Sequence, residues 1–220
     1  MNIIVVEDQL MFRDVIRKAC SGRAGHNVIG ETDSGVKAVD LILRLKPDAV
    51  ILDLSLPDMD GFNVVDQVTK ELPKLSILVV SSHCDDYTLF RVEKSKVHGF
   101  VDKNSNTVQT LRQALTTIES GGIFFSQTFR AAKAARHANP HSYMKLLSDH
   151  ERAVLSLIGQ GLDDEEMGER LNISFRTAQT HRSRILRKLM IKGTPKLIAF
   201  AIEHGFTRAQ STHGARPVFS

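Results

Sequence analysis

The sequence predicts an α/β domain with a doubly wound, five-stranded parallel sheet, followed by an all-α domain of about four helices. Up to residue 120, short β-branched apolar runs alternate with segments of helical periodicity, as in parallel sheets with helices on both faces. From residue 148 onward only helical patterns occur. The charge changes as well: residues 1–120 hold 14 Lys+Arg against 17 Asp+Glu, whereas residues 121–220 hold 15 against 8. The basic half indicates a polyanionic partner.

The elements of the α/β domain follow one another in regular alternation. The strands are expected at Ile3–Val6, Val28–Gly30, Ala49–Leu52, Ile77–Val80 and Phe100–Val101. The helices are expected near 9–20, 35–45, 61–71, 86–95 and 106–119. In such a sheet, ligands bind at the carboxyl ends of the strands, so chemistry is expected at that edge.

Capping signals divide the second half into helices. A helix at 127–137 is expected to precede a linker at 138–142. The four helices that follow begin at side-chain N-caps. These caps are Ser148 and Asp163, each with a glutamate three residues later, then Ser174, and finally Thr194 with Pro195 at the first helical position. The predicted domains are therefore 1–121, a helical linker at 122–145, the helical domain at 146–206 and a flexible tail at 207–220.

Composition argues against membrane and disulfide-rich proteins. No apolar run approaches the roughly 18 residues of a bilayer-spanning helix, and Met1–Val6 enters a strand pattern without a basic leader. The two cysteines, Cys20 and Cys84, fit no metal-binding spacing and are expected to be reduced thiols. The sequence therefore predicts a cytoplasmic protein.

Polar side chains stand where predicted strands end. Glu7 and Asp8 follow the first strand and Asp53 follows the third, and parallel neighbours bring these ends together. Three carboxylates repel one another unless a cation neutralises them, and oxygen ligands suit Mg²⁺. Ser81 and Lys103 end the fourth and fifth strands and could hold phosphoryl oxygens. Any one of these residues fits a solvated loop, but the full set favours phosphoryl transfer with Asp53 as the nucleophile.

These residues resemble the receiver domains of response regulators, across residues 2–120. The resemblance rests on Val5–Asp8, Asp48–Gly61, Ser81–His83 and Gly99–Lys103. It implies a flavodoxin-like fold and phosphorylation of Asp53 by a histidine kinase. One departure is Asn104, which follows Lys103 where many receivers have proline.

The same resemblance implies roles for the remaining pocket residues. Asp8 would bind Mg²⁺ directly and Glu7 through water, and Asp53 and the backbone carbonyl of Ser55 would complete the Mg²⁺ ligands. Ser81 and Phe100 would form a switch pair, in which the hydroxyl turns toward the phosphoryl group and the aromatic ring follows. From the residues alone, Phe100 is more simply a core residue. Ser55 and His83 would flank the water that hydrolyses the aspartyl phosphate, and the sequence does not predict how long that phosphate persists.

A basic helix is predicted in the second half. Between Phe175 and Lys192 lie six basic residues and no acidic one. The apolar positions beneath them keep helical spacing: Ala178, Ile185 and Leu189. A helix and a three-residue turn precede this segment, as in helix-turn-helix proteins. Its first turn, with Ser174 and Thr177, could offer backbone N–H groups to a phosphate.

Residues 147–206 resemble the C-terminal domain of LuxR/NarL-type regulators, through Leu147–Leu155, Gly161-Leu162, Leu171–Ser174, Thr177 and Thr180–Leu189. The resemblance implies that residues 174–189 form a recognition helix in the major groove. The base contacts would come from Gln179, Thr180 and Ser183, and the phosphate contacts from Arg176, Arg182, Arg184 and Lys188, with Arg187 also at the DNA.

Three departures from the LuxR/NarL pattern bear on the operator. Ala178 and Gln179 stand where valine and lysine are usual, and Met190 stands where a glycine is common. A glutamine can pair with adenine, which a lysine cannot, so an unusual operator is expected.

The combined prediction is a NarL/FixJ-type response regulator. It would be a transcription factor and not an enzyme, and it would bind double-stranded DNA as a homodimer when phosphorylated. One alternative is an adaptor whose output is a protein contact, which the basic helix disfavours. The other is a phosphatase of the haloacid-dehalogenase kind, which the absence of a DxDx(T/V) pattern after any strand disfavours.

Overall fold

The computed structural model describes residues 1–21, 25–105, 107–138 and 143–207. The chain divides into two compact units, the first chiefly residues 1–84 and 90–131, the second chiefly the residues from Ala132 onward. Most of the predicted linker at 138–142 and of the predicted tail at 207–220 lies outside the described residues. Among the helices in the described ranges, none has the length and apolarity of a membrane span.

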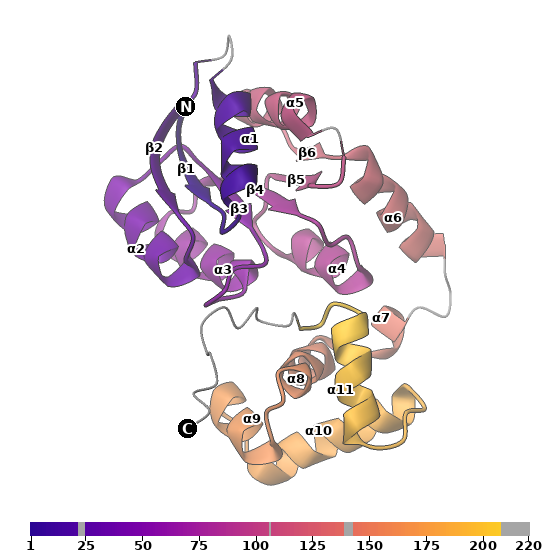
Figure 1. Cartoon of the computed structure of the whole chain (residues 1–220). Helices are drawn as coiled ribbons and strands as arrows, with labels where there is room; N and C mark the ends of the chain where they lie inside the picture. The colour runs from indigo at the N-terminus through magenta and orange to yellow at the C-terminus, as the bar shows by residue number, and fades with distance from the viewer. Residues whose placement is uncertain (22–24, 106, 139–142, 208–220) are drawn as a thin grey trace, which may run out of the picture. The chain divides into compact units, whose positions relative to one another are not determined.

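The first unit alternates strands and helices (Figure 1). Its strands are β1 (Asn2–Val6), β2 (Asn27–Thr32), β3 (Ala49–Asp53), β4 (Ser76–Ser81), β5 (Gly99–Asp102) and β6 (Phe124–Phe125). Its helices are α1 (Leu10–Cys20), α2 (Gly35–Leu45), α3 (Gly61–Glu71), α4 (Asp86–Lys94) and α5 (Thr107–Glu119), followed by α6 (Gln127–Ala138). The strands form one parallel sheet in the order β2-β1-β3-β4-β5-β6.

The sheet has six strands, so the predicted number of five is wrong by one. The additional strand, β6, is two residues long and pairs Phe124 with Gly99 and Phe125 with Phe100. Two residues are too few to show the alternation by which strands are recognised in a sequence. The parallel, doubly wound architecture itself is confirmed.

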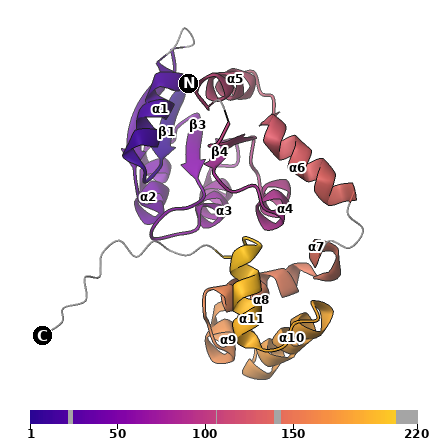
Figure 2. The same cartoon turned by 45° about the vertical axis from the view of Figure 1, so that its right-hand side comes forward.

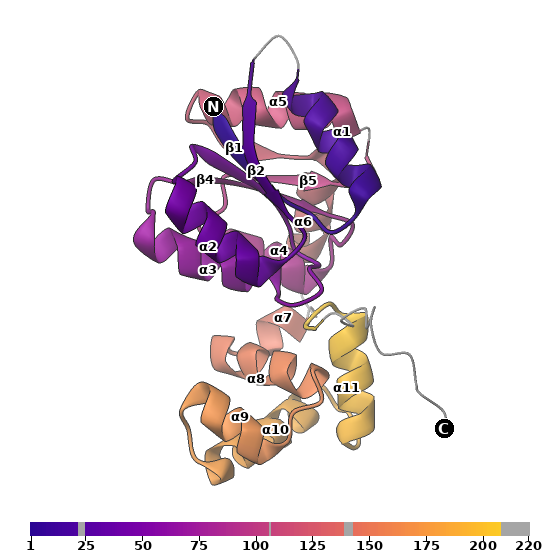
Figure 3. The same cartoon turned by 60° about the vertical axis from the view of Figure 1, so that its left-hand side comes forward.

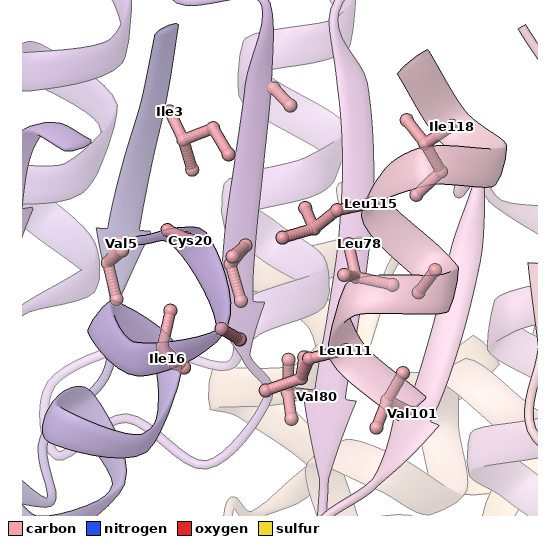
Figure 4. Close-up of a cluster of buried hydrophobic side chains, with 14 residues drawn as sticks. Ile3, Val5, Ile16, Cys20, Leu78, Val80, Val101, Leu111, Leu115 and Ile118 are labelled. Atoms are coloured by element: carbon pink, nitrogen blue, oxygen red, sulfur yellow. The ribbon is translucent and has the colours of Figure 1, made fainter. Parts of the chain in front are cut away.

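Helices cover both faces of the sheet, with α1 and α5 on one side and α2, α3 and α4 on the other (Figure 3). Successive strand residues point to opposite faces. Ile3 and Val5 of β1 therefore pack with Leu111 and Leu115 of α5 in one core cluster, and the side chains of α1 complete it (Figure 4). Ile4, on the opposite face, is equally buried. Burial on both faces explains why the strands are continuous apolar runs.

The first turn of α6 belongs to the core of the first unit. Phe129 is almost fully buried, and its ring centroid lies 4.9 Å from that of Phe100 and 4.7 Å from that of Phe125. The prediction treated this helix as part of the linker. The three phenylalanines instead anchor its start on β5 and β6.

The second unit contains α7 (Tyr143–Leu146), α8 (Asp149–Gly159), α9 (Asp164–Leu171), α10 (Phe175–Lys188) and α11 (Thr194–Glu203). Figure 2 shows α8 to α11 packed together as one group of helices. Its fully buried residues include Leu155, Ile158, Ala178, Ile185 and Leu197. The short helix α7 was not predicted.

Three of the four predicted caps in this unit are confirmed. Ser148 and Asp163 form complete capping boxes, and the Ser174 hydroxyl accepts a hydrogen bond from the Thr177 amide at 3.1 Å. The prediction for Thr194 is wrong. Gly193, with φ of 88°, is the N-cap of α11, and Thr194 is already helical. The Thr194 hydroxyl instead accepts a hydrogen bond from Arg182 at 3.3 Å.

Candidate functional site

The strand registers bring the predicted pocket residues to one edge of the sheet. Val6 of β1 lies beside Leu52 of β3, so Glu7 continues next to Asp53. Asp53 in turn lies beside Val80 of β4, and the Lys103 amide donates to the Ser81 carbonyl at 3.0 Å. The parallel sheet therefore gathers residues that are far apart in the chain, as the prediction required.

Lys103 is the cation of this pocket. Its Nζ lies 2.9 Å from Oδ2 of Asp53 and 2.9 Å from Oε1 of Glu7. Oε2 of Glu7 is closer still, at 2.7 Å, but without hydrogen-bond geometry. All three side chains are buried. One ammonium thus faces two buried carboxylates, and negative charge is in excess.

A third carboxylate increases this excess. One carboxylate oxygen from each of Glu7, Asp8 and Asp53 lies within 4.8 Å of the other two. Burial, and after it the charge of Asp53, raise the pKa of Glu7 to about 7 against the lowering effect of Lys103. The positive charge of Lys103 therefore offsets only part of the cost of charging Glu7 in this pocket.

Two buried carboxylate oxygens of the pocket lack a hydrogen-bond donor among the described residues. They are Oδ1 of Asp8 and Oε2 of Glu7, and the second of these is still in ionic contact with the Lys103 ammonium at 2.7 Å. Unsatisfied buried acceptors carry a free-energy cost that a bound cation would remove. These oxygens are the hard ligands that divalent cations such as Mg²⁺ prefer, so the residues present fit such an ion.

The loop after β3 is held by two aspartates and a glycine. Asp58 accepts hydrogen bonds from the Ser34 hydroxyl at 2.6 Å and from the Gly35 amide at 2.7 Å, which joins the loop to the start of α2. Asp60 caps α3 through the Phe62 amide. A Cβ on Gly61 would lie 2.5 Å from the Asp53 carbonyl oxygen, so only glycine fits there. The loop is therefore fastened closely around Asp53.

The remaining predicted pocket residues are placed as follows. The Ser55 amide donates to Oδ1 of Asp53 at 3.1 Å. The Ser81 hydroxyl is buried and accepts a hydrogen bond from the His83 amide at 3.1 Å. Phe100 is fully buried against Phe129. The Lys103–Asn104 peptide bond is trans. The pocket and its surroundings are therefore assembled, whereas the switching of Ser81 and Phe100 stays a prediction.

The second candidate site is the exposed face of α10. At about 100° per residue, Arg176, Thr180, Ser183 and Arg187 share one side of the helix, and all four are exposed. Exposed Gln179 flanks this side, and so does exposed Arg184. The Thr180 hydroxyl donates to the Arg176 carbonyl at 2.7 Å, which leaves its methyl group and lone pairs for outside contacts.

Two of the predicted phosphate contacts have partners inside the second unit. Nε of Arg182 lies 2.9 Å from Oδ1 of Asp164 in α9, in an ion pair without hydrogen-bond alignment. Nζ of Lys188 donates to Oε2 of Glu151 in α8 at 2.7 Å. Both cations border the buried side of α10. They attach the helix to α8 and α9, while the Lys188 side chain stays 39% exposed, and the role of both residues at DNA stays a prediction.

The ion pair of Glu151 with Lys188 between α8 and α10 is supported by a second hydrogen bond. Its carboxylate also accepts the Ser148 amide at 2.7 Å. Burial raises the pKa of Glu151, but the hydrogen bonds from Lys188 and Ser148 outweigh burial and hold that pKa below its ordinary value. The charged form of Glu151 is thus the one that this fold favours.

Family models match both units. The response regulator receiver domain matches residues 3–116, and the LuxR family of bacterial regulatory proteins matches residues 145–201. The response regulator protein VraR of Staphylococcus saprophyticus is 26% identical over 204 residues, which cover 93% of this chain and 97% of that protein. VraR of Staphylococcus aureus has the same identity and coverage.

Solved structures give the same result for the fold. A complex of the two-component response regulator RcsB with DNA has a TM-score of 0.62 at 25% identity, covering 91% of this chain and 96% of that one. RcsB of Salmonella enterica serovar Typhimurium, bound to a promoter in the presence of a phosphomimetic, also has a TM-score of 0.62, at 24% identity, with 91% and 97% covered.

A parallel sheet with an acidic pocket at its carboxyl edge, joined to a helical domain with a basic helix, defines a two-domain signalling regulator. The chain belongs to the response regulator family, of the NarL/FixJ type, with a receiver domain followed by a LuxR-type DNA-binding domain.

Reasoning from the sequence assigned no role to three residues that lie around the pocket. Asp58 and Gly61 shape the pocket loop, but their contacts with α2 and with Asp53 are invisible without the fold. Phe12 lies against Lys103, with its ring centroid 4.7 Å from Nζ. The one available signal was that Phe12 is the sole aromatic residue in a helix predicted to begin beside Asp8.

Proposed function

We propose that Asp53 is the phosphorylation site and that its phosphorylation controls DNA binding by α10. The observation that carries this proposal is the pocket itself: a buried aspartate held between Lys103 and two further carboxylates, with oxygens that lack donors. Buried negative charge of this kind has no evident structural benefit, because it costs stability.

The chemistry is a transfer of a phosphoryl group from a phosphohistidine of a histidine kinase. A carboxylate oxygen of Asp53 attacks phosphorus, the new O–P bond forms, and the N–P bond to the departing imidazole breaks. Lys103 already contacts Asp53, and its ammonium would hold an oxygen of the incoming group. The Ser55 amide, bonded to Oδ1, would keep the carboxylate in one orientation.

Mg²⁺ is the proposed cofactor. Glu7, Asp8, Asp53 and the backbone carbonyl of Ser55 would hold it, and the two oxygens without donors support this set. When bound, Mg²⁺ offsets the charge on the phosphoryl oxygens. Few protein ligands and several retained waters are consistent with weak binding in the unphosphorylated state.

The proposed output is sequence-specific transcription control. Gln179, Thr180 and Ser183 would read base edges, while Arg176, Arg184 and Arg187 would contact phosphates. Ser81 and Phe100 would report the phosphorylated state within the receiver. One helix-turn-helix reads few base pairs, so a two-fold dimer on paired half-sites is proposed for the phosphorylated protein. RcsB supports this proposal, because one of its solved structures contains two RcsB dimers bound to two parallel DNAs.

In this proposal the protein acts as a cytoplasmic regulator and not as an enzyme that turns over a separate substrate. The matches to a receiver domain and to the LuxR family of bacterial regulatory proteins support this proposal, because a regulator of transcription acts where the DNA lies. The helix at 194–204 was a predicted candidate for the dimer face, through Leu197, Ile198 and Ala201. Leu197 and Ala201 are buried in the core of the domain, so exposed residues of α11, such as Ile202 at 47% exposure, are proposed instead.

A labelling experiment with a DNA-binding readout tests the proposal. Acetyl phosphate with Mg²⁺ should add one phosphoryl group, about 80 Da for the HPO₃ of an acyl phosphate, and should strengthen binding to selected genomic fragments. Asp53→Asn should abolish both effects. Asp40→Asn, at an exposed aspartate of α2, is the matched control and should keep both. If Asp53→Asn were labelled to the same extent as the wild type, the assignment of Asp53 as the phosphorylation site would be wrong.

A further inference from the structure

The ammonium of Lys103 has an aromatic neighbour in addition to its carboxylates. Nζ lies over the Phe12 ring, 4.7 Å from the centroid. This distance is well within the roughly 6 Å at which a cation is attracted to the face of an aromatic ring. The Lys103 side chain is only 6% exposed, so water screens this attraction little.

Phe12 is the one inward-facing member of an apolar triplet. Leu10 and Met11 are 71% and 80% exposed, whereas Phe12 is partly buried and packs against the core shared by α1, α5 and the sheet. Its amide donates to the Gln9 carbonyl at 3.0 Å in the first turn of α1. The ring is thus held on a rigid element that begins two residues after Asp8.

The contact with the ring does not use up an N–H donor of Lys103. A lysine ammonium is a mobile point charge on a four-carbon chain with three N–H donors. The carboxylates of Glu7 and Asp53 engage those donors, and an incoming phosphoryl group would compete for them. Attraction to a ring face needs no particular N–H, so it can persist while hydrogen-bond partners change.

We propose that Phe12 is a positioning residue for phosphorylation: its ring keeps the Lys103 ammonium at the pocket while the N–H donors exchange between carboxylate and phosphoryl oxygens. This inference rests on the proposed function of Asp53. A purely packing role for Phe12 is the competing explanation, and the two differ in whether the electrons of the ring matter.

Fluorination of the ring separates the two explanations. Phenylalanine analogues with one, two and three ring fluorines, incorporated at residue 12, weaken the negative face of the ring while changing its volume little. The initial rate of labelling by acetyl phosphate, at saturating Mg²⁺, should fall stepwise with each fluorine. Phe12→Leu, which keeps apolar bulk, should label about three- to tenfold more slowly, and Phe12→Tyr should stay near wild type.

Val15→Ala is the matched control for packing, because Val15 lies on α1 and borders the same core. It should label at the wild-type rate. Equal rates across the fluorinated series, or an equal loss in Val15→Ala, would overturn the positioning role and leave only packing.

A second measurement does not depend on phosphorylation. In NMR spectra of protein with labelled lysine, the Cε protons of Lys103 should be shifted upfield by the Phe12 ring and should return to ordinary values in Phe12→Leu. An unshifted resonance in the wild type would refute the contact itself. If wild type and Asp53→Asn were labelled equally while this shift was present, the proposed function would fail and the contact would stand without a catalytic role.

Discussion

The receiver and the DNA-binding domain differ in how their buried carboxylates are paired with cations. In the receiver, three carboxylates lie close together, and two of them, Glu7 and Asp53, share the ammonium of Lys103. In the DNA-binding domain, Glu151 and Asp164 pack against α10 and each has its own cation: Glu151 pairs with Lys188 and Asp164 with Arg182.

This difference separates ligand sites from structural supports. The receiver keeps its excess charge inside a pocket, where an added cation can balance it. The DNA-binding domain matches its inward charges and leaves the excess positive charge on the exposed side of α10, where a polyanion can reach it. A basic residue of α10 can therefore be proposed as a DNA contact only when its ion-pair partners inside the domain are known.

The largest expected effect is the loss of the receiver cation. Lys103→Ala leaves Glu7 and Asp53 buried without compensation, so the free energy of unfolding should fall by about 3–5 kcal/mol without Mg²⁺. Urea unfolding measures this, at a pH above 7 so that Glu7 is charged. Lys74→Ala, at an exposed lysine, is the control, and a similar midpoint for both variants would contradict the charge argument.

The next largest effect on stability is expected for the ion pair of Glu151 with Lys188 in the DNA-binding domain. Glu151→Gln removes the charge that Lys188 and the Ser148 amide stabilise, and should lower the stability of this domain by about 2–3 kcal/mol. Thermal unfolding followed by signals of this domain measures the loss. Glu169→Gln changes an exposed glutamate of α9 and should have little effect. Equal stability of the two variants would count against a structural pair.

The same pair predicts a pH dependence. Because the pKa of Glu151 is lower in the folded state than its ordinary 4.5, its contribution to stability is present above that pH and is lost as the pH falls through the folded-state pKa. Acid unfolding of the wild type should therefore lose a contribution that Glu151→Gln lacks. Parallel acid transitions in both proteins would show that Glu151 is not linked to folding.

On DNA, the residues of α10 proposed to contact bases and those proposed to contact phosphates should differ. Gln179→Ala should weaken binding to the specific site by about 1–3 kcal/mol and random DNA little, because it removes a base contact. Arg187→Ala should weaken all sequences and flatten the dependence of log affinity on log salt by about one unit. Titrations on specific and random duplexes at several salt concentrations distinguish the two.

Lys188→Ala sharpens this test. The sequence alone predicted that this change would flatten the salt dependence, but the ion pair with Glu151 now predicts an unchanged slope and a less stable domain. A slope lowered as much as in Arg187→Ala would return Lys188 to the phosphate contacts.

The smallest expected effect has the opposite sign. Asp8→Asn removes one of the repelling carboxylates, so the Mg²⁺-free receiver should become more stable by about 1 kcal/mol. In the wild type, Mg²⁺ at about ten times its Kd should add about 1.4 kcal/mol, and the variant should not respond. Unfolding midpoints with and without Mg²⁺ measure both. A destabilised variant would mean that Asp8 is compensated by groups in the protein.

Much of this structure follows from local patterns. The alternating apolar runs placed β1 to β5, and the serine and aspartate caps placed α8, α9 and α10, because burial and capping act within one or two turns. Thr194 shows the limit of such reasoning. Its threonine–proline signature predicts a cap, yet its hydroxyl is taken by Arg182, and Gly193 occupies the cap position.

The order of the elements, the acids at the strand ends and the basic character of α10 could be predicted from local patterns, because these depend on neighbouring residues and on periodicity. Which charges are partners could be known only from the packed fold. Arg182 and Arg187 look alike along the chain, but one meets Asp164 and the other is exposed. Lys188 pairs with a glutamate 37 residues away. An ion pair depends on the distance between side chains of separate elements, and packing alone sets that distance.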